Sequence, residues 1–141
     1  MKTLNTTAAL QYKTFIKTVI GFYSVGKNKT NVGLMVYSSV TITKFTFTSF
    51  YSKSDINNAI DTMDYPENDT NTGAALAVVE RDLFGHVHTG RPNCLVTMTD
   101  GVSNDDVSLP SAHLKAMKVI TLAVGVGDYY AKEDQIGRAH V

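Results

Sequence analysis

The 141-residue sequence predicts an α/β fold, specifically a three-layer, doubly wound, mostly parallel sheet with one antiparallel edge strand. Short apolar runs alternate along the chain with segments whose apolar residues recur every three or four positions. Several of the runs are apolar on both faces, which is typical of parallel strands covered by helices on both sides. Such a sheet usually begins with its central strand, whereas this sequence opens with polar residues and a helical pattern. We therefore expect the first central strand to be missing.

Size and composition indicate one ordinary domain. The chain has a mass of 15.4 kDa, and 43% of its residues are hydrophobic, which supplies a sizeable core. Its formal net charge is zero, so it lacks the electrostatic footprint of a protein that binds nucleic acid or an acidic membrane. No apolar run approaches about 18 residues, which argues against membrane insertion. The single cysteine, Cys94, excludes an internal disulfide and is expected to be an inert buried thiol.

The first half of the chain predicts two helices and two strands. The first helical pattern places five apolar residues on one face and is expected to end at Gly26; they are Tyr12, Phe15, Ile16, Val19 and Tyr23. Residues 32–37 predict a buried strand, and the partial alternation of residues 41–48 predicts a half-exposed antiparallel edge strand. A second helix begins at Ser52 with a capping pattern, and residues 64–68 break it. Its apolar stripe consists of Ile56, Ala59, Ile60 and Met63.

The second half predicts two more helices and two buried strands. A third helix is expected from about Thr72 to Phe84, followed by a loop over residues 85–92. Its buried residues are predicted to be Ala75, Leu76, Val79 and Leu83. Pro110 fits the first turn of a fourth helix, which carries Leu114 and Met117. The buried strands are expected at residues 94–99 and 119–124.

Two groups suited to a hard divalent cation lie where an open α/β sheet binds its ligands, beyond the carboxyl ends of the strands. Asp100 follows the strand expected at residues 94–99, and Thr70 lies in the loop before the third helix. A carboxylate and threonine hydroxyls suit Mg²⁺, which prefers oxygen ligands. From spacing alone the simpler interpretation is a helix-capping Thr70 and a turn formed by Asp100. Thr72 is expected to cap the helix or to place its hydroxyl next to the metal ligands without binding the metal.

Five stretches together resemble the von Willebrand factor A domain in their order and spacing. They are TNVGLMVYS (30–38), TNTGAAL (70–76), GRP (90–92), VTMTDG (96–101) and LAVGVG (122–127). Each is weak alone, but together they are highly specific and cover roughly residues 15–128. The nearest look-alikes are the extracellular members in collagen-like, matrilin-like and cochlin-like matrix proteins. The resemblance implies the Rossmann-like fold of that family.

The resemblance also implies a metal-ion-dependent adhesion site. In this family the metal is held by an Asp-x-Ser-x-Ser motif after the first strand, a Thr before the third helix and an Asp after the fourth strand. By position, Thr70 matches the Thr and Asp100 matches the Asp, whereas the Asp-x-Ser-x-Ser motif is absent from the sequence. The intact domain is thus expected to bind Mg²⁺, or else Mn²⁺ or Ca²⁺, and these residues alone are expected to bind it poorly.

Both ends of the sequence are expected to be artificial. Because the missing motif would precede the first helix, we expect Met1 to be an internal methionine of a longer protein. Residues 136–141 match the translation of a common sequencing-adapter read-through and are expected to be a non-native tail. The partial A domain is assigned to residues 1–135.

The implied function is that of a non-enzymatic binding module in an extracellular or matrix protein. Mg²⁺ in the intact domain would bind an acidic group of a protein ligand, such as collagen or another matrix protein. Three Asn-x-Ser/Thr sequons, at Asn5, Asn28 and Asn68, are candidate N-glycosylation sites and modestly support a secreted protein. No GxSxG or HExxH motif is present, so hydrolase chemistry has no visible nucleophile or metal helix.

Three alternatives remain open from the sequence. The domain could be an intracellular A-domain scaffold for complex assembly, or a degenerate A domain without metal. A nucleotide-dependent enzyme is the third, because residues 21–28 fall one residue short of a phosphate-binding loop. Asn28 replaces its Ser/Thr, however, and the segment ends a helix. His86 and His88 are expected to be solvated loop residues, since no third metal ligand lies near them in sequence.

Overall fold

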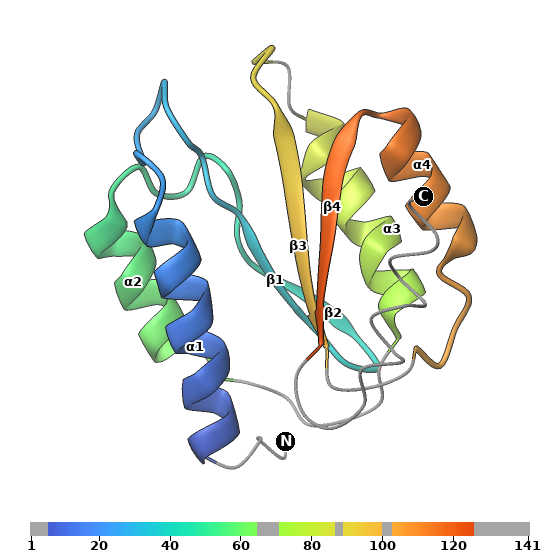
Figure 1. Cartoon of the computed structure of the whole chain (residues 1–141), viewed down its shortest axis with the longest axis horizontal. Helices are drawn as coiled ribbons and strands as arrows, with labels where there is room; N and C mark the ends of the chain where they lie inside the picture. The colour runs from blue at the N-terminus through green and yellow to red at the C-terminus, as the bar shows by residue number, and fades with distance from the viewer. Residues whose placement is uncertain (1–5, 65–70, 87–88, 100–102, 126–141) are drawn as a thin grey trace. The chain divides into compact units, whose positions relative to one another are not determined.

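The computed structural model describes residues 6–64, 71–86, 89–99 and 103–125, and Figure 1 shows the whole chain. These residues form two compact units, one from residues 1–36 with 42–68 and the other from residues 37–41 with 69–141. The α-helices and strands follow the predicted order, α1, β1, β2, α2, α3, β3, α4 and β4, and a short 3₁₀ helix, η1, follows α3. Among the described residues, none of the helices has the length and hydropathy needed to cross a membrane.

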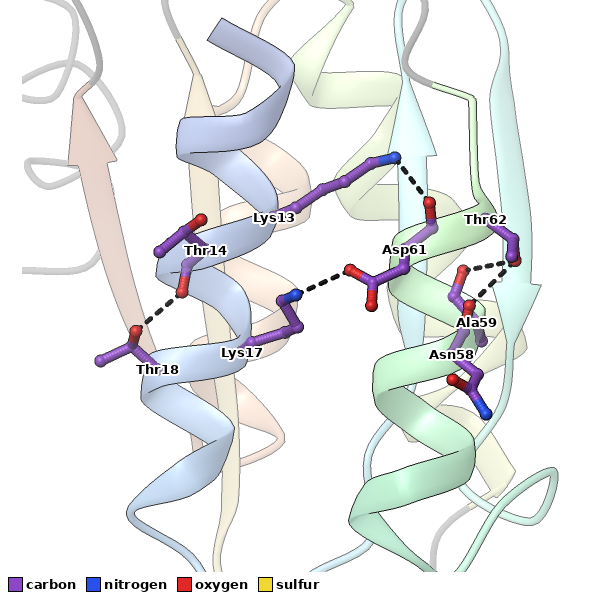
Figure 2. Close-up of polar contacts among 8 residues, drawn as sticks. All are labelled: Lys13, Thr14, Lys17, Thr18, Asn58, Ala59, Asp61 and Thr62. Carbon is purple, nitrogen blue, oxygen red and sulfur yellow. Dashed lines mark hydrogen bonds and ion pairs between the residues drawn. The ribbon is translucent and has the colours of Figure 1, made fainter. Parts of the chain in front are cut away.

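In the first unit, helices α1 (Thr6–Gly21) and α2 (Lys53–Thr62) lie side by side and are joined by polar contacts (Figures 1 and 2). The Lys13 ammonium donates to the carbonyl of Asp61 at 3.1 Å, and the Lys17 ammonium pairs with the Asp61 carboxylate at 2.7 Å. These groups are exposed, so the ion pair adds little stability, and the apolar core beneath holds the unit together. The buried members of that core are Ile20, Val36, Phe45, Ile56, Ile60 and Met63.

Helix α1 ends earlier than predicted, at Gly21 rather than Gly26. Its last turn tightens, because the Tyr23 amide donates to the carbonyl of Ile20 at 3.0 Å. The free carbonyl of Gly21 is then satisfied by the Lys53 ammonium at 3.1 Å. Tyr23 lies beyond the helix and is exposed, so it does not share the helix face predicted for it. Ile20, which was not among the predicted apolar residues of this helix, is buried.

Helix α2 forms as predicted. The Ser52 hydroxyl accepts the Asp55 amide at 3.2 Å, which confirms Ser52 as the N-cap. Ile56 and Ile60 are fully buried, and Met63 is nearly so. The predicted apolar stripe therefore faces the core of this unit.

Strands β1 (Leu34–Tyr37) and β2 (Thr41–Phe45) are hydrogen-bonded to each other. Only three residues connect them, which is too short for a parallel crossover, so the pair is antiparallel as predicted. Strand β2 ends at Phe45, three residues before the predicted end. The amide of Thr46 donates to the Ser49 hydroxyl at 2.9 Å, so local side-chain bonds replace the strand ladder there.

In the second unit, α3 (Thr72–Asp82) and α4 (Ser108–Ala116) pack together. All four predicted core residues of α3 and its continuation are buried. Leu114 of α4 is fully buried, and Pro110 lies in the first turn of that helix. His113 is exposed on α4, and its Nδ1 lies 3.3 Å from a Glu80 carboxylate oxygen on α3. A short 3₁₀ helix, η1 (Phe84–His86), occupies the start of the predicted loop, and His86 is exposed there.

Strands β3 (Asn93–Thr99) and β4 (Val119–Gly125) pair in parallel, with Val96 opposite Leu122. Figure 1 shows α3 and α4 on one side of this pair. Val119 is buried, and strand alternation places it on the face opposite to that of Ile120 and Leu122. The other side carries exposed apolar side chains, so the predicted burial of both faces does not hold within this unit. Those residues are Val96, Ile120 and Leu122.

Cys94 also differs from its prediction. It lies on the same open side of the β3–β4 pair as Val96, because alternate residues of a strand share a face. The residue is exposed, so the expectation of a buried thiol was wrong, although partial desolvation still raises the pKa of the thiol. A raised pKa keeps the thiol protonated and unreactive at neutral pH.

Candidate metal centre

The predicted metal residues Thr70 and Asp100 lie outside the described residues, but the chain next to each of them is described. Asn71 follows Thr70 directly, and β3 ends at Thr99, one residue before Asp100. The sequons at Asn5 and Asn68 lie outside the described residues too, as do His88 and residues 126–141. The site is therefore built from the residues that flank the two predicted ligands, all in the second unit.

The residue after Thr70 is held at the end of β1. The Asn71 amide donates to the carbonyl of Ser38 at 3.0 Å, and its side-chain amide donates to the carbonyl of Ser39 at 3.3 Å. Ser38 is buried and directly follows β1. The start of α3 is thus fastened to the carboxyl end of β1, where an open α/β sheet places its ligand site.

Two hydroxyls, one fully buried and one half-buried, connect the same helix start to β3. Thr72 is fully buried, and its hydroxyl lies 3.4 Å from the phenolic oxygen of Tyr37, to which it donates. The Tyr37 hydroxyl donates in turn to the carbonyl of Met98, also at 3.4 Å. These are long hydrogen bonds and individually weak. Their placement shows that Thr72 links structural elements and is not the N-cap of α3, which is Asn71.

Asp105, which was not among the predicted site residues, receives the shortest polar contacts in this region. Its Oδ1 accepts the Gly73 amide at 2.7 Å and the Ser103 hydroxyl at 2.6 Å, and its Oδ2 accepts the Ala74 amide at 2.8 Å. Burial alone would raise the pKa of Asp105, but these hydrogen bonds outweigh it and lower the pKa. The carboxylate is therefore ionised at neutral pH and faces the positive end of the α3 dipole.

The described polar groups around the start of α3 come from several elements. The carboxyl ends of β1 and β3, the start of α3 and the loop at residues 103–106 meet in one region rich in hydroxyl and carboxylate oxygen. Thr70 directly precedes Asn71 in the sequence, and Asp100 directly follows Thr99, the last residue of β3. Within the described ranges, no three His, Cys, Asp or Glu side chains form a group that could hold a metal.

The family comparison identifies the fold. The model of the von Willebrand factor type A domain matches residues 3–136. The chain belongs to the von Willebrand factor type A domain family. Membership confirms the resemblance read from the five sequence stretches, and with it the predicted Rossmann-like, doubly wound α/β class.

Several relatives of this A domain are much longer than the chain. The collagen alpha-6(VI) chain of Homo sapiens is 35% identical over 117 residues, which are 81% of this chain and 5% of the collagen chain. Matrilin-4 of Homo sapiens is 31% identical over 121 residues, covering 82% of this chain and 20% of matrilin-4. Vitrin of Homo sapiens is 32% identical over 128 residues, covering 89% and 19% respectively. The chain thus spans a fifth or less of the length of these relatives.

Solved structures share the A-domain fold, and two contain a metal. Proximal thread matrix protein 1 from the mussel byssus, with a zinc-occupied metal-ion-dependent adhesion site (MIDAS), superposes with a TM-score of 0.81. It is 27% identical, and the match covers 91% of this chain and 36% of that one. Manganese-loaded TRAP of Plasmodium vivax superposes with a TM-score of 0.74 at 19% identity, covering 89% of this chain and 53% of that one. The similarity to TRAP, at this low identity, supports the fold only.

Proposed function

We propose that this A domain is a non-enzymatic, metal-dependent protein-binding module of an extracellular matrix protein. The main support is the convergence described above, in which the start of α3, directly after Thr70, contacts the ends of β1 and β3 and the loop at residues 103–106. The collagen VI, matrilin-4 and vitrin relatives support the matrix assignment, and the zinc-occupied site of the mussel protein supports a divalent metal.

The proposed roles follow from the chemistry of the two residues. The Asp100 carboxylate supplies charge and the Thr70 hydroxyl supplies a neutral oxygen, and both are ligands that Mg²⁺ accepts. The Asp and Ser groups of the family motif, which this sequence does not contain, would be needed to complete the site. Bound Mg²⁺ would offer an open coordination position to an acidic side chain of the partner. Collagen or another matrix protein is the proposed partner.

The one described sequon is compatible with secretion. Asn28 is exposed at the tip of a small closed loop, in which the Thr30 amide donates to the carbonyl of Ser24 at 2.9 Å. The Lys29 amide donates to the carbonyl of Gly26 at 3.1 Å, so Asn28 lies within a tight turn. Exposure of the acceptor on a surface turn is what an N-glycan requires.

The function is tested with the domain encoded by the native transcript, together with its native flanking sequence. Binding to immobilised collagens and other matrix proteins is measured in Mg²⁺ and in EDTA. We expect binding to at least one of these proteins in Mg²⁺ and loss of that binding in EDTA. Asp100→Ala should weaken the Mg²⁺-dependent binding at least about tenfold.

Thr70 needs its own control, because it is also the third residue of the Asn68 sequon. Thr70→Val removes the hydroxyl and the sequon together, whereas Asn68→Gln removes the sequon alone. We expect Thr70→Val to weaken binding and both Asn68→Gln and Thr70→Ser to preserve it. Binding that persists in EDTA, or that Asp100→Ala leaves unchanged, would favour a degenerate A domain without metal. Absence of the native protein from the secreted fraction would favour the intracellular scaffold.

A further inference from the structure

The zero net charge of the chain is the sum of two strongly charged parts. Seven of its 13 basic residues and none of its 13 acidic residues precede Asp55. The first 54 residues therefore have a formal charge of +7, and the remaining residues have a formal charge of −7. All seven basic residues are lysines, and all belong to the first unit. Asymmetry of this size within one chain indicates a surface for a charged partner.

The lysines of the first unit differ in how far their charge is neutralised. Lys13 and Lys17 both contact Asp61, the first at its carbonyl and the second at its carboxylate. Lys27 and Lys29, by contrast, are exposed, and no ion pair joins either of them to a carboxylate of the described residues. Their positive charge is therefore available to a partner in solution.

The loop that carries these two lysines is held in one conformation by hydrogen bonds. The Gly26 amide donates to the carbonyl of Thr30 at 3.2 Å, and the Asn31 side-chain amide donates to the carbonyl of Gly26 at 2.8 Å. The stem of Lys29 lies against Gly26, where an added Cβ would be 3.2 Å from the Lys29 Cδ. A preformed loop of this kind loses less conformational entropy when it binds a partner.

A third lysine and two aromatic rings extend this surface. The Lys53 ammonium contacts the carbonyl of Gly21, so the start of α2 lies beside the segment that leads from α1 into the loop (Figure 1). Phe22 and Tyr23 in that segment are exposed, Phe22 to 83%. Asp55 in the first turn of α2 is the acidic residue nearest to this end in sequence. We call Lys27, Lys29, Lys53, Phe22 and Tyr23 the lysine surface.

We propose that the lysine surface binds a sulfated polysaccharide of the extracellular matrix. The sulfate groups supply the negative charges that the ammonium groups attract, and the faces of sugar rings can stack on the two exposed aromatic rings. These rings and the proposed matrix location favour a polysaccharide over an acidic protein. The lysine surface lies in the first unit and needs no metal, whereas the flanks of the proposed metal site lie in the second. The two functions can therefore fail separately.

The test is binding of the native domain to heparin in EDTA, which removes metal-dependent binding. Every protein carries Asn28→Gln, because a glycan between the two loop lysines would cover them. Lys27→Gln combined with Lys29→Gln should weaken binding at least about tenfold near physiological salt, and should lower the slope of log affinity against log salt by about two. Lys115→Gln combined with Lys118→Gln removes the same charge from exposed positions of the second unit, and should change affinity less than about twofold.

A charge-preserving variant and a second polyanion complete the test. Lys27→Arg combined with Lys29→Arg should keep heparin binding, because both positive charges remain. Equal weakening by the two double Gln variants would mean that heparin responds only to total charge, and would overturn the proposal. Binding of poly-L-glutamate as tight as that of heparin would indicate an acidic protein partner and overturn it too. Heparin binding that requires Mg²⁺ would assign the contact to the metal instead.

Discussion

Asp105 stabilises the start of α3 from outside that helix, and its contacts show how much one carboxylate can organise. It binds two backbone amides of α3 and the hydroxyl of Ser103 in its own loop. Its lowered pKa reflects the balance between burial, which opposes the charge, and these donors, which favour it. Gly73 admits the contact because any larger residue would collide with the Asp106 carbonyl.

Asn28 is the residue at which we predict a modification. We expect expression in secreting eukaryotic cells to attach an N-glycan there, because the side chain is exposed on a turn. The measurement is the intact mass before and after enzymatic removal of N-glycans. Asn28→Gln and Thr30→Ala should each remove the mass of one glycan, and Thr30→Ser should retain it. A mass unchanged by Asn28→Gln would show that the sequon is unused.

At the scale of helices and strands, apolar burial determines where α2 packs. Ile60 is fully buried within the core of the first unit, whereas Ile42 on β2 is 41% exposed. We expect Ile60→Ala to lower the free energy of unfolding by about 2–5 kcal/mol, through lost burial and the cavity left behind. Alanine has a higher helix propensity than isoleucine, so the loss of stability would come from packing.

Urea denaturation of the chain, monitored by circular dichroism, measures this difference. Ile42→Ala is the matched control and should cost less than about 1 kcal/mol, because its side chain is already partly in water. Equal losses in the two variants would show that the described core does not hold α2.

A helix with clear apolar periodicity and a capping residue was predictable from the sequence. The end of β2 and the role of Asp105 were not. Ser52 and the spacing of Ile56 and Ile60 specify α2 directly. The end of β2 was missed because the hydroxyls of Thr46 and Ser49 compete locally for backbone groups, which alternation does not reveal. Asp105 was missed because its partners lie far away in sequence. The glycine at position 73 and the polar loop after β3 were the only signals available.

At the scale of the whole molecule, family membership explains why the motifs predicted the fold better than the site. The described parts of the five stretches lie in or next to β1, α3, β3 and β4, so their order specifies the α/β class. The proposed metal site needs groups from several of these ends, and Thr70 and Asp100 are only two of them. Their metal-binding role stays a prediction.

The most direct test of the central claim is a Mn²⁺ titration of the native domain, followed by electron paramagnetic resonance. Wild type and Asp100→Ala are compared, with Asp64→Ala as an exposed-carboxylate control from the end of the first unit. We predict saturable binding to wild type and to Asp64→Ala, and its loss in Asp100→Ala. Saturable binding that is the same in all three proteins, or absent from all three, would contradict a metal site built on Thr70 and Asp100.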